Sequence, residues 1–256
     1  MRGLLLRVGR SYQLQRPGCP QVARRAASLL TPPNDANPTI SPQIPTPLPP
    51  FVVARFITFE GGEGAGKSTQ LRHLAAALAA QGVAVITTRE PGGSPHAEFL
   101  RGVLLSGAHD FAPSTEMLLH FAARAEHLAR TIQPALHAGT WVLCDRFYDS
   151  TEAYQVHGQG ADAAQFAALK NLVQPHPDLT LVLDVDETVA AARQAARARA
   201  ADRYDRLGAG FHARVAAGFR QIAAANPERC VLINANQNEA EVAATILQTV
   251  TARFPC

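Results

Sequence analysis

The stretch GGEGAGKST, residues 61–69, decides the fold class of this 256-residue chain. It fits the pattern GxxxxGK[ST] and lies between a predicted strand, residues 55–60, and a predicted helix that ends at Gly82. Glycines let backbone N–H groups turn toward phosphate oxygens, and the N-terminus of the following helix adds partial positive charge. The motif therefore predicts a nucleoside triphosphate site, with Lys67 on the β- and γ-phosphates and Ser68 on Mg²⁺. The residues predicted to contact ATP are Gly61, Gly62, Glu63, Gly64, Ala65, Gly66, Lys67, Ser68 and Thr69.

Segments typical of strands and of helices alternate along the rest of the chain. Residues 114–137 are predicted to be largely helical, with Pro134 as a kink or a stop. Strands that alternate with helices indicate a parallel sheet covered on both faces, so we expect an α/β fold of three layers. The further strands are predicted at residues 83–88, 141–145, 179–184 and 231–234.

The first fifty residues differ in composition from the rest. Six arginines precede the first acidic residue, Asp35, and prolines crowd residues 32–50. We expect residues 1–50 to be a disordered extension and residues 51–256 to form one domain. An arginine-rich, acid-poor segment is also typical of an organellar presequence, and a start codon assigned too far upstream is a third reading.

Composition excludes several classes of function. A net charge of +3 is small for this length, so neither nucleic acid nor a membrane surface is expected as a partner. No apolar run approaches the roughly 20 residues that span a bilayer. The four cysteines are widely spaced, which fits a reducing compartment and argues against a zinc site. We expect a cytoplasmic protein, or an organellar one if residues 1–50 are a presequence.

Polar residues follow the second and third predicted strands. Arg89 comes at the end of the second strand, and Arg101 lies on the helix after it. Asp145 ends the third strand, where it suits Mg²⁺, and Arg146 beside it can bind a phosphate through two N–H groups. Because ligands gather at the carboxyl ends of parallel strands, these side chains should meet in one cleft. The next residues, suited to a base and a sugar on one helical turn, are Thr151, Tyr154 and Gln155.

Five stretches of this sequence, in order, resemble the thymidylate kinase family of nucleoside monophosphate kinases. The resemblance implies a nucleoside monophosphate kinase fold with a lid at about residues 193–208. It also implies transfer of the γ-phosphoryl group of ATP to dTMP with Mg²⁺, by a homodimer. The stretches, which span about residues 56–219, are FITFEGGEGAGKSTQ, TREPGG, LLHFAARAEHL, DRFYDSTEAYQ and DRYDRLGAGFHARVAAGF.

The resemblance also implies roles for single residues. Arg89 and Arg146 match positions at the phosphate and magnesium end of dTMP, and Arg101 matches another acceptor contact. Glu63 matches an acidic position that faces the sugar of the acceptor, near its 3′-hydroxyl. Arg124 matches the arginine that reads the thymine ring. Thr151 and Gln155 match hydrogen-bonding partners of the base, and Tyr154 matches the residue near the 2′ carbon.

One departure from the family pattern concerns the residue that stacks on thymine. Family members place an aromatic residue four positions before the arginine that matches Arg124. In this sequence that position is His120, and Phe121 is one further along. Either His120 stacks on the base, or a small shift of the helix lets Phe121 do so.

Phosphoryl transfer needs positive charge around the moving group. Some members of the family carry an arginine in the phosphate loop, but here Gly64 and Ala65 follow Glu63. The basic segment at residues 193–203 resembles the lid of the bacterial form, which donates the arginine instead. We favour Arg197, with Arg199 and Arg203 as alternatives. The predicted catalytic residues are Lys67, Arg146, Arg197 and Glu63.

Two other functions compete with this prediction. Another nucleoside monophosphate or deoxynucleoside kinase could use the same phosphate loop. A GTP-binding switch, which acts by binding, would need an NKxD motif, and Asn-Ala-Asn-Gln at residues 234–237 does not match it.

Overall fold

The computed structural model describes residues 53–196 and 203–255. The predictions for residues 1–50, and those for Arg197 and Arg199, therefore lie outside the described residues. Within this part of the chain, no helix is both long enough and apolar enough to cross a bilayer. The described cysteines, Cys144 and Cys230, are free and buried.

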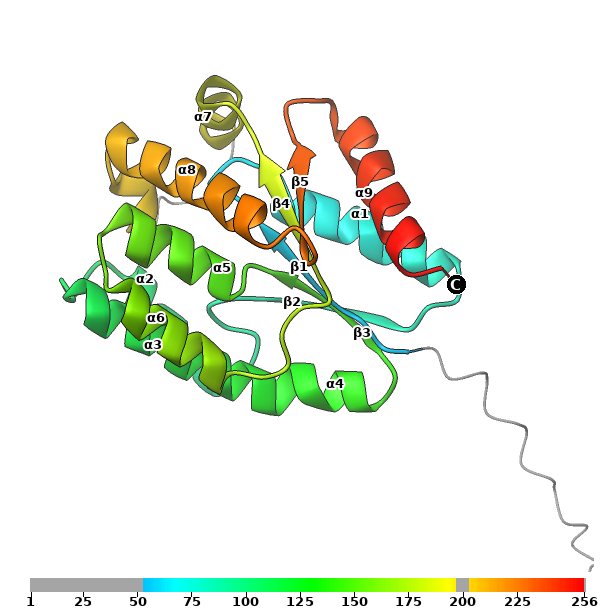
Figure 1. Ribbon diagram of the computed structural model, residues 1–256, viewed down its shortest axis with the longest axis horizontal. Coiled ribbons are helices and arrows are strands. Elements are labelled where there is room, and N and C mark those ends of the chain that lie inside the picture. Colours follow the sequence, from blue (N-terminus) through cyan, green and yellow to red (C-terminus); the bar gives the residue numbers. More distant parts are fainter. Residues whose placement is uncertain (1–52, 197–202, 256) are drawn as a thin grey trace, which may run out of the picture. The chain divides into compact units, whose positions relative to one another are not determined.

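A parallel sheet of five strands, in the order β2-β3-β1-β4-β5, forms the centre of the described domain (Figure 1). Every neighbouring pair of strands is parallel, as predicted. The ends of the strands differ from the predicted ends by two residues at most. The strands are β1 (Phe56–Glu60), β2 (Val85–Arg89), β3 (Trp141–Asp145), β4 (Leu179–Asp184) and β5 (Cys230–Asn234).

Helices cover both faces of the sheet and give the predicted three layers (Figure 1). On one face, α1 (Lys67–Ala80) and α9 (Glu239–Arg253) enclose a core that includes Ile57 and Phe59 of β1. The opposite face carries α3, α4, α5, α6 and α8, with α2 packed against α3. The remaining elements are α2 (Pro95–Leu105), α3 (Pro113–His127), η1 (Leu128–Ile132), α4 (Gln133–His137), α5 (Tyr148–Thr151), η2 (Glu152–Gly158), α6 (Ala163–Leu172), α7 (Glu187–Ala195), η3 (Tyr204–Arg206) and α8 (Ala209–Ala225).

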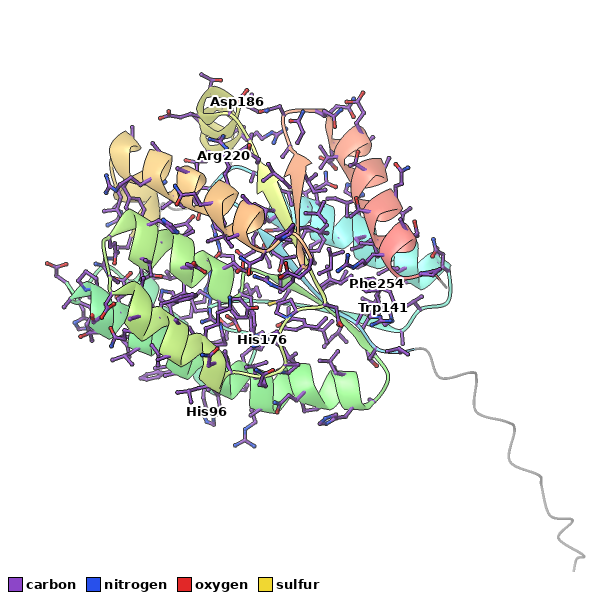
Figure 2. The ribbon with its side chains drawn as sticks, viewed as in Figure 1. His96, Trp141, His176, Asp186, Arg220 and Phe254 are labelled. Carbon is purple, nitrogen blue, oxygen red and sulfur yellow. The ribbon has the colours of Figure 1, made fainter. Side chains whose placement is uncertain are left out.

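The end of the chain closes the core on the α9 face. Phe254 follows α9, and its ring packs edge-on against Trp141 at the start of β3, with 5.8 Å between the ring centroids (Figure 2). Both side chains are buried. Such an aromatic pair stabilises a fold by about 0.5–1.5 kcal/mol beyond the area that it buries. The C-terminal helix is thereby attached to the central sheet.

Pro134 neither stops nor breaks the long helical segment, which runs from Pro113 to His137 through η1. Proline lacks an N–H group, and its ring crowds the carbonyl group four residues earlier. The π-helical turn η1, which is wider than an α-helical turn, immediately precedes the turn that contains Pro134. The local widening accommodates the ring and lets the helix continue.

The register of the sheet brings the predicted site together. Asp145 at the end of β3 pairs with Phe59 of β1 on one side and with Arg89 of β2 on the other. The phosphate loop follows β1, so it lies at the same edge of the sheet as the polar residues after β2 and β3. Chain segments more than 80 residues apart in sequence therefore share one edge.

Candidate active site

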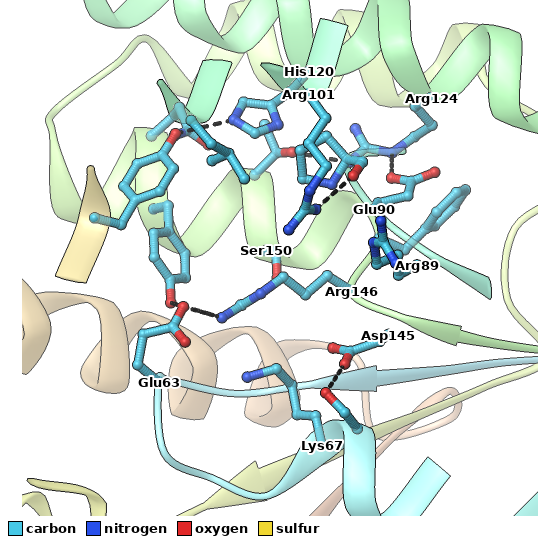
Figure 3. A pocket seen from close by; sticks show the side chains of 18 residues that line it. Glu63, Lys67, Arg89, Glu90, Arg101, His120, Arg124, Asp145, Arg146 and Ser150 are labelled. Atoms are coloured by element: carbon cyan, nitrogen blue, oxygen red, sulfur yellow. Dashed lines mark hydrogen bonds and ion pairs between the residues drawn. The ribbon is translucent and has the colours of Figure 1, made fainter. Parts of the chain in front are cut away.

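A cleft of about 270 Å³ opens at the carboxyl ends of β1, β2 and β3 (Figure 3). Most of the predicted site residues line it. The residues that the sequence did not predict there are Glu90, Pro91, Leu105, Phe147, Ser150 and Tyr204. The predicted residues in its wall are Glu63, Lys67, Ser68, Arg89, Arg101, His120, Arg124, Asp145, Arg146, Thr151, Tyr154 and Gln155.

The phosphate loop has a backbone that requires glycine at two positions. Gly61 has φ +132°, and a Cβ atom there would lie 2.4 Å from the carbonyl oxygen of Leu183. Gly64 has φ +77°, and its Cβ would lie 2.5 Å from the carbonyl oxygen of Ala190. Side chains at these positions would both strain the backbone and clash with it. The loop is completed by Gly62, Ala65 and Gly66, and Thr69 lies in the first turn of α1.

Lys67 is the first residue of α1, and its side chain is buried within the loop. Its ammonium group donates to the carbonyl oxygens of Gly61 at 3.0 Å and Gly62 at 2.7 Å. Burial and the nearby positive charge of Arg146 lower the pKa of Lys67 from 10.5 to about 8. The ammonium is therefore mostly charged at pH 7 and about half charged at pH 8.

Binding of ATP is expected to take up protons at pH 8. Phosphate charge favours the ammonium form of Lys67, so binding raises the lowered pKa and draws in about half a proton at pH 8 but close to none at pH 6. Affinity for ATP should accordingly fall as the pH rises above 8. Calorimetry in two buffers of different ionisation enthalpy measures the uptake. Lys67→Arg should abolish it, since a guanidinium does not titrate in this range; an unmodified chain that takes up no proton at pH 8 contradicts the expectation.

Ser68 and Asp145 bring two oxygen ligands together beside Lys67. The Ser68 hydroxyl donates to Oδ2 of Asp145 at 2.5 Å. Mg²⁺ prefers oxygen ligands, and usually takes only one or two groups from the protein and the rest from water and phosphates. Consistent with this, residues 53–196 and 203–255 contain no cluster of three or more His, Cys, Asp or Glu that could hold a metal. The pair fits a magnesium ion that a nucleotide brings with it.

Arg146 is fixed from several directions in the turn between β3 and α5. Its backbone has φ +71°, which is rare for a residue other than glycine. Its guanidinium donates to Gly61 O, Ser150 Oγ and Tyr154 OH at 3.0–3.1 Å and to Oε1 of Glu63 at 2.5 Å. It also lies 4.9 Å from the centroid of the Tyr154 ring. These contacts hold the planar fork at the centre of the cleft, between the phosphate loop and the predicted sugar contacts.

A buried carboxylate that the sequence analysis did not assign shapes this turn. Glu60, the last residue of β1, accepts hydrogen bonds from the backbone N–H of Phe147 at 2.7 Å and from the Ser150 hydroxyl at 2.5 Å. Burial, together with the charge of Asp149, raises the pKa of Glu60 to about 8. The available signal was a glutamate in the otherwise apolar strand FITFE, where a carboxylate is stable only with dedicated donors.

Arg124 forms the far wall of the cleft and retains an unused donor. Its Nε donates to Glu90 at 2.7 Å and its Nη2 to the Thr151 hydroxyl at 3.0 Å. Glu90 is held in turn by Nδ1 of His127 at 3.0 Å. Nη1 is buried and has no hydrogen-bond partner among the residues that the structure describes. A buried donor without a partner costs about 1–3 kcal/mol, so this atom marks a place for an acceptor on a ligand.

The structure separates the two alternatives for the stacking residue. His120 lines the cleft, and its Nε2 lies 3.0 Å from the hydroxyl of Tyr204. The assignment of Phe121 to the cleft is wrong, because its ring is buried in the core against Phe166, with 5.9 Å between centroids. One residue along a helix corresponds to a rotation of about 100°, which turns Phe121 away. Burial, then the charge of Arg124, lowers the pKa of His120 to about 3, so the ring is uncharged near pH 7.

The remaining predicted arginines lie at the margins of the cleft. Arg89 pairs with Glu98 at 3.1 Å, and its side chain is half exposed. Arg101 lines the cleft and donates to the carbonyl oxygen of Pro91 at 2.7 Å. Arg203, one of the three lid candidates, donates to Oε2 of Glu116 at 2.5 Å. Arg89 and Arg101 thus belong to the wall of the cleft, whereas Arg203 does not and is paired with Glu116 of α3.

Comparisons with known proteins agree with one another. The sequence model of a family described as thymidylate kinase matches residues 59–246. A thymidylate kinase from Gluconobacter oxydans is 50% identical over 199 residues, which are 76% of this chain and 93% of the relative. One from Caulobacter vibrioides is 51% identical over 202 residues, 78% and 97% of the two chains. The crystal structure of a thymidylate kinase from Ehrlichia chaffeensis matches with a TM-score of 0.63 at 36% identity, covering 77% of this chain and 98% of that one.

Proposed function

Since this chain belongs to the thymidylate kinase family, we propose that it transfers the γ-phosphoryl group of ATP to dTMP, giving dTDP and ADP. The observation that carries the proposal is the shape of the cleft at the carboxyl ends of β1, β2 and β3. It joins a triphosphate-binding loop at one end to a buried arginine with an unused N–H group at the other. A mononucleotide placed between them would have its phosphate beside Lys67 and Arg146 and its base beside Arg124. The product serves the synthesis of dTTP.

At the phosphate end, the chain supplies charge and position and no covalent chemistry. Lys67 and the N–H groups of the loop would hold the β- and γ-phosphates of ATP, and Arg146 would hold the phosphate of dTMP. Ser68 and Asp145 would hold Mg²⁺, which supplies neutralisation of the phosphate charge when bound. Because Arg146 is already fixed by four acceptors, it would meet the acceptor phosphate without first losing side-chain freedom.

At the base end, we assign the unused Nη1 of Arg124 to the O4 atom of thymine, with Thr151 and Gln155 as further partners of the base. His120 would stack on the ring as a neutral imidazole. Tyr154 would lie against the 2′ carbon and disfavour ribose. The thymine methyl group adds only about 10- to 200-fold preference, because one methyl group in an apolar pocket is worth about 1–3 kcal/mol.

A panel of phosphoryl acceptors tests the proposal. The purified chain is supplied with ATP and Mg²⁺, and ADP formation is followed with dTMP, dUMP, dCMP, dGMP and thymidine in turn. We expect dTMP to give the highest kcat/KM and thymidine to give no turnover. A higher kcat/KM for another monophosphate, or for the nucleoside, would establish the competing kinase function. Nucleotide binding without turnover of any acceptor would favour a binding role.

Glu63→Gln is expected to weaken dTMP and leave ATP almost unchanged. Oε1 of Glu63 accepts from Arg146 at 2.5 Å and from the Tyr154 hydroxyl at 3.1 Å, so this carboxylate faces the acceptor side of the cleft. Loss of a hydrogen bond to a charged group costs about 1.5–3 kcal/mol, so KM for dTMP should rise about tenfold or more. Steady-state kinetics with each substrate varied in turn measures the two effects. An equal rise in both KM values would place Glu63 on the ATP phosphates instead.

We also propose that the lid supplies the further positive charge. Of the three candidates, Arg203 is committed to Glu116, which leaves Arg197 and Arg199, both outside the described residues. Arg197 remains our choice for the catalytic arginine. Replacing Arg197 and Arg199 by alanine one at a time, and comparing kcat at saturating substrates, decides between them.

We further propose a cytoplasmic homodimer that binds neither nucleic acid nor membranes. An exposed apolar side chain supports an interface: Phe99 on α2 is 72% exposed. Two buried free thiols, those of Cys144 and Cys230, suit a reducing compartment. Light scattering should give twice the 27.3 kDa of one chain, and a mass of one chain would exclude the dimer.

A further inference from the structure

Glu116 on α3 is a fully buried carboxylate behind the base end of the cleft, and the proposed chemistry does not use it. Its Oε1 accepts from the amide nitrogen of Gln155 at 2.8 Å, from that of Gln159 at 3.2 Å, and from the hydroxyl of Tyr204. Its Oε2 accepts from Arg203 at 2.5 Å. Glu116 is absent from the wall of the cleft, whereas Gln155 and Tyr204 belong to it. It therefore acts on the cleft only through its neighbours.

The first neighbour is the side-chain amide of Gln155, whose orientation Glu116 dictates. A carboxylate only accepts hydrogen bonds, so the NH₂ group of Gln155 has to face it. The same nitrogen donates to the Tyr204 hydroxyl at 3.0 Å. Both N–H groups are thus taken by Glu116 and Tyr204, so the carbonyl oxygen is the group that the Gln155 amide can offer to a ligand in the cleft. The wall of the cleft therefore includes an acceptor from Gln155 as well as the unused donor of Arg124.

This order of acceptor and donor distinguishes pyrimidine bases. Thymine offers an N–H group at N3 and a carbonyl oxygen at O4, which complement Gln155 and Arg124. Cytosine offers an unprotonated N3 and an NH₂ group at C4, so it would place acceptor against acceptor and donor against donor. A site built to hydrogen-bond one pattern rejects the wrong one by about 10⁴- to 10⁵-fold, since its buried polar groups are left unpaired. A flipped Gln155 amide would lose half of this complementarity.

The second neighbour is Tyr204, through whose hydroxyl group Glu116 also fixes the hydrogen bonding of His120, the proposed stacking residue. Its one hydroxyl proton goes to Glu116, so its oxygen accepts from Gln155 and from Nε2 of His120. His120 therefore carries its ring proton on Nε2. Arg203 and Tyr204 also stand in the segment proposed as the lid. Glu116 thereby connects Gln155 to two residues of that segment.

We propose that Glu116 is a positioning residue that sets base specificity: it holds the Gln155 amide with its oxygen toward the base and so excludes cytosine nucleotides. The inference rests on the proposed function, because it takes dTMP as the acceptor. It adds a residue that contacts no substrate and that no local motif marks as functional.

The test compares dCMP with dTMP as acceptors in Glu116→Gln. The new amide can donate as well as accept, so it no longer dictates how Gln155 lies. We expect the ratio of kcat/KM for dCMP to that for dTMP to rise at least tenfold, with KM for ATP unchanged. A merely structural role would lower both values in proportion and leave the ratio as it was. Glu126→Gln, on the same helix but with a partly exposed side chain paired to Arg130 and absent from the wall of the cleft, is the matched control and should not change the ratio.

Three further variants keep the test decisive. Glu116→Asp retains a carboxylate and should keep the ratio close to that of the unmodified chain. In a Gln155→Leu background, Glu116→Gln should have no further effect on the ratio, because the amide that it positions is gone. Should Glu116→Gln alone not fold, Glu116→Gln with Arg203→Leu removes both charges of the ion pair together and is assayed in the same way.

The outcomes separate this inference from the proposed function. If the unmodified chain does not phosphorylate dTMP, the proposed function fails. If it does so, and the folded Glu116→Gln variant keeps the ratio within twofold, the role of Glu116 is overturned and the proposed function stands.

Discussion

Arg146→Ala is expected to lower kcat by about a thousandfold. An arginine that stabilises a transferring phosphoryl group is worth about 10³- to 10⁵-fold in rate. Arg146 is positioned for such a role, because Glu63, Ser150 and Tyr154 fix its guanidinium between the phosphate loop and the acceptor site. Arg146→Lys keeps the charge but not the planar fork, so it should recover only a small part of the loss. Steady-state kcat at saturating ATP and dTMP measures the effect.

The backbone at this position calls for a second variant as control. Arg146 has φ +71°, and an L-residue in the left-handed region carries roughly 1–2 kcal/mol of strain. Arg146→Gly removes that strain together with the side chain, whereas Arg146→Ala keeps the strain. Equal losses of kcat in the two variants, with thermal unfolding showing both folded, assign the effect to the guanidinium. A kcat within tenfold of the unmodified chain in either variant would remove Arg146 from the transition state.

Arg124→Met is expected to lower the stability of the fold and to abolish useful affinity for dTMP. The ion pair between Arg124 and Glu90 is buried, with side-chain exposures of 1% and 3%. Removing one partner of a buried ion pair costs about 3–5 kcal/mol, because the other charge is left uncompensated. Loss of the donor to the base should raise KM for dTMP at least a hundredfold, which corresponds to about 2.7 kcal/mol. Urea unfolding and steady-state kinetics measure the two effects separately.

A double variant separates the role in folding from the role in binding. Arg124→Met with Glu90→Gln has no uncompensated carboxylate, so it should regain part of the lost free energy of unfolding. It should not regain affinity for dTMP, since the donor to the base is still missing. Recovery of dTMP affinity in the double variant would show that Arg124 acts only by stabilising the fold.

The sequence predicted the parts of the site that depend on local patterns. Lys67 and Ser68 follow from the spacing of one loop, and Asp145 and Arg146 follow from their place at a strand end. The choice between His120 and Phe121 needed the structure, because it turns on the rotation of one helix by about 100°. Local spacing thus predicted which residues stand at the edge of the sheet, but not which way a helical side chain points.

The carboxylates that position the site were not predicted. Glu90 binds Arg124, Glu116 binds Gln155, and Glu60 binds Ser150, whose hydroxyl group accepts from Arg146. The contacts of these three glutamates join residues 34 to 90 positions apart in sequence. The periodicity of a sequence does not indicate contacts between residues so far apart. Each of these glutamates also lies in a segment whose local pattern is fully explained by a strand, a turn or a helix, so nothing local indicated a further role. Their burial identifies them in three dimensions, because a buried carboxyl group is costly without hydrogen-bond partners.

The contacts of Lys67 and Arg146 have a consequence for the crowded ionic medium of a cell. Both cations already have internal partners: the carbonyl oxygens of the loop for Lys67, and the carboxylate of Glu63 for Arg146. A small anion such as inorganic phosphate must displace these partners and offers little in exchange. A nucleotide displaces the same partners, but it also gains contacts through its base, its sugar and several phosphate oxygens. We therefore expect abundant simple anions to bind at Lys67 and Arg146 much more weakly than nucleotides do.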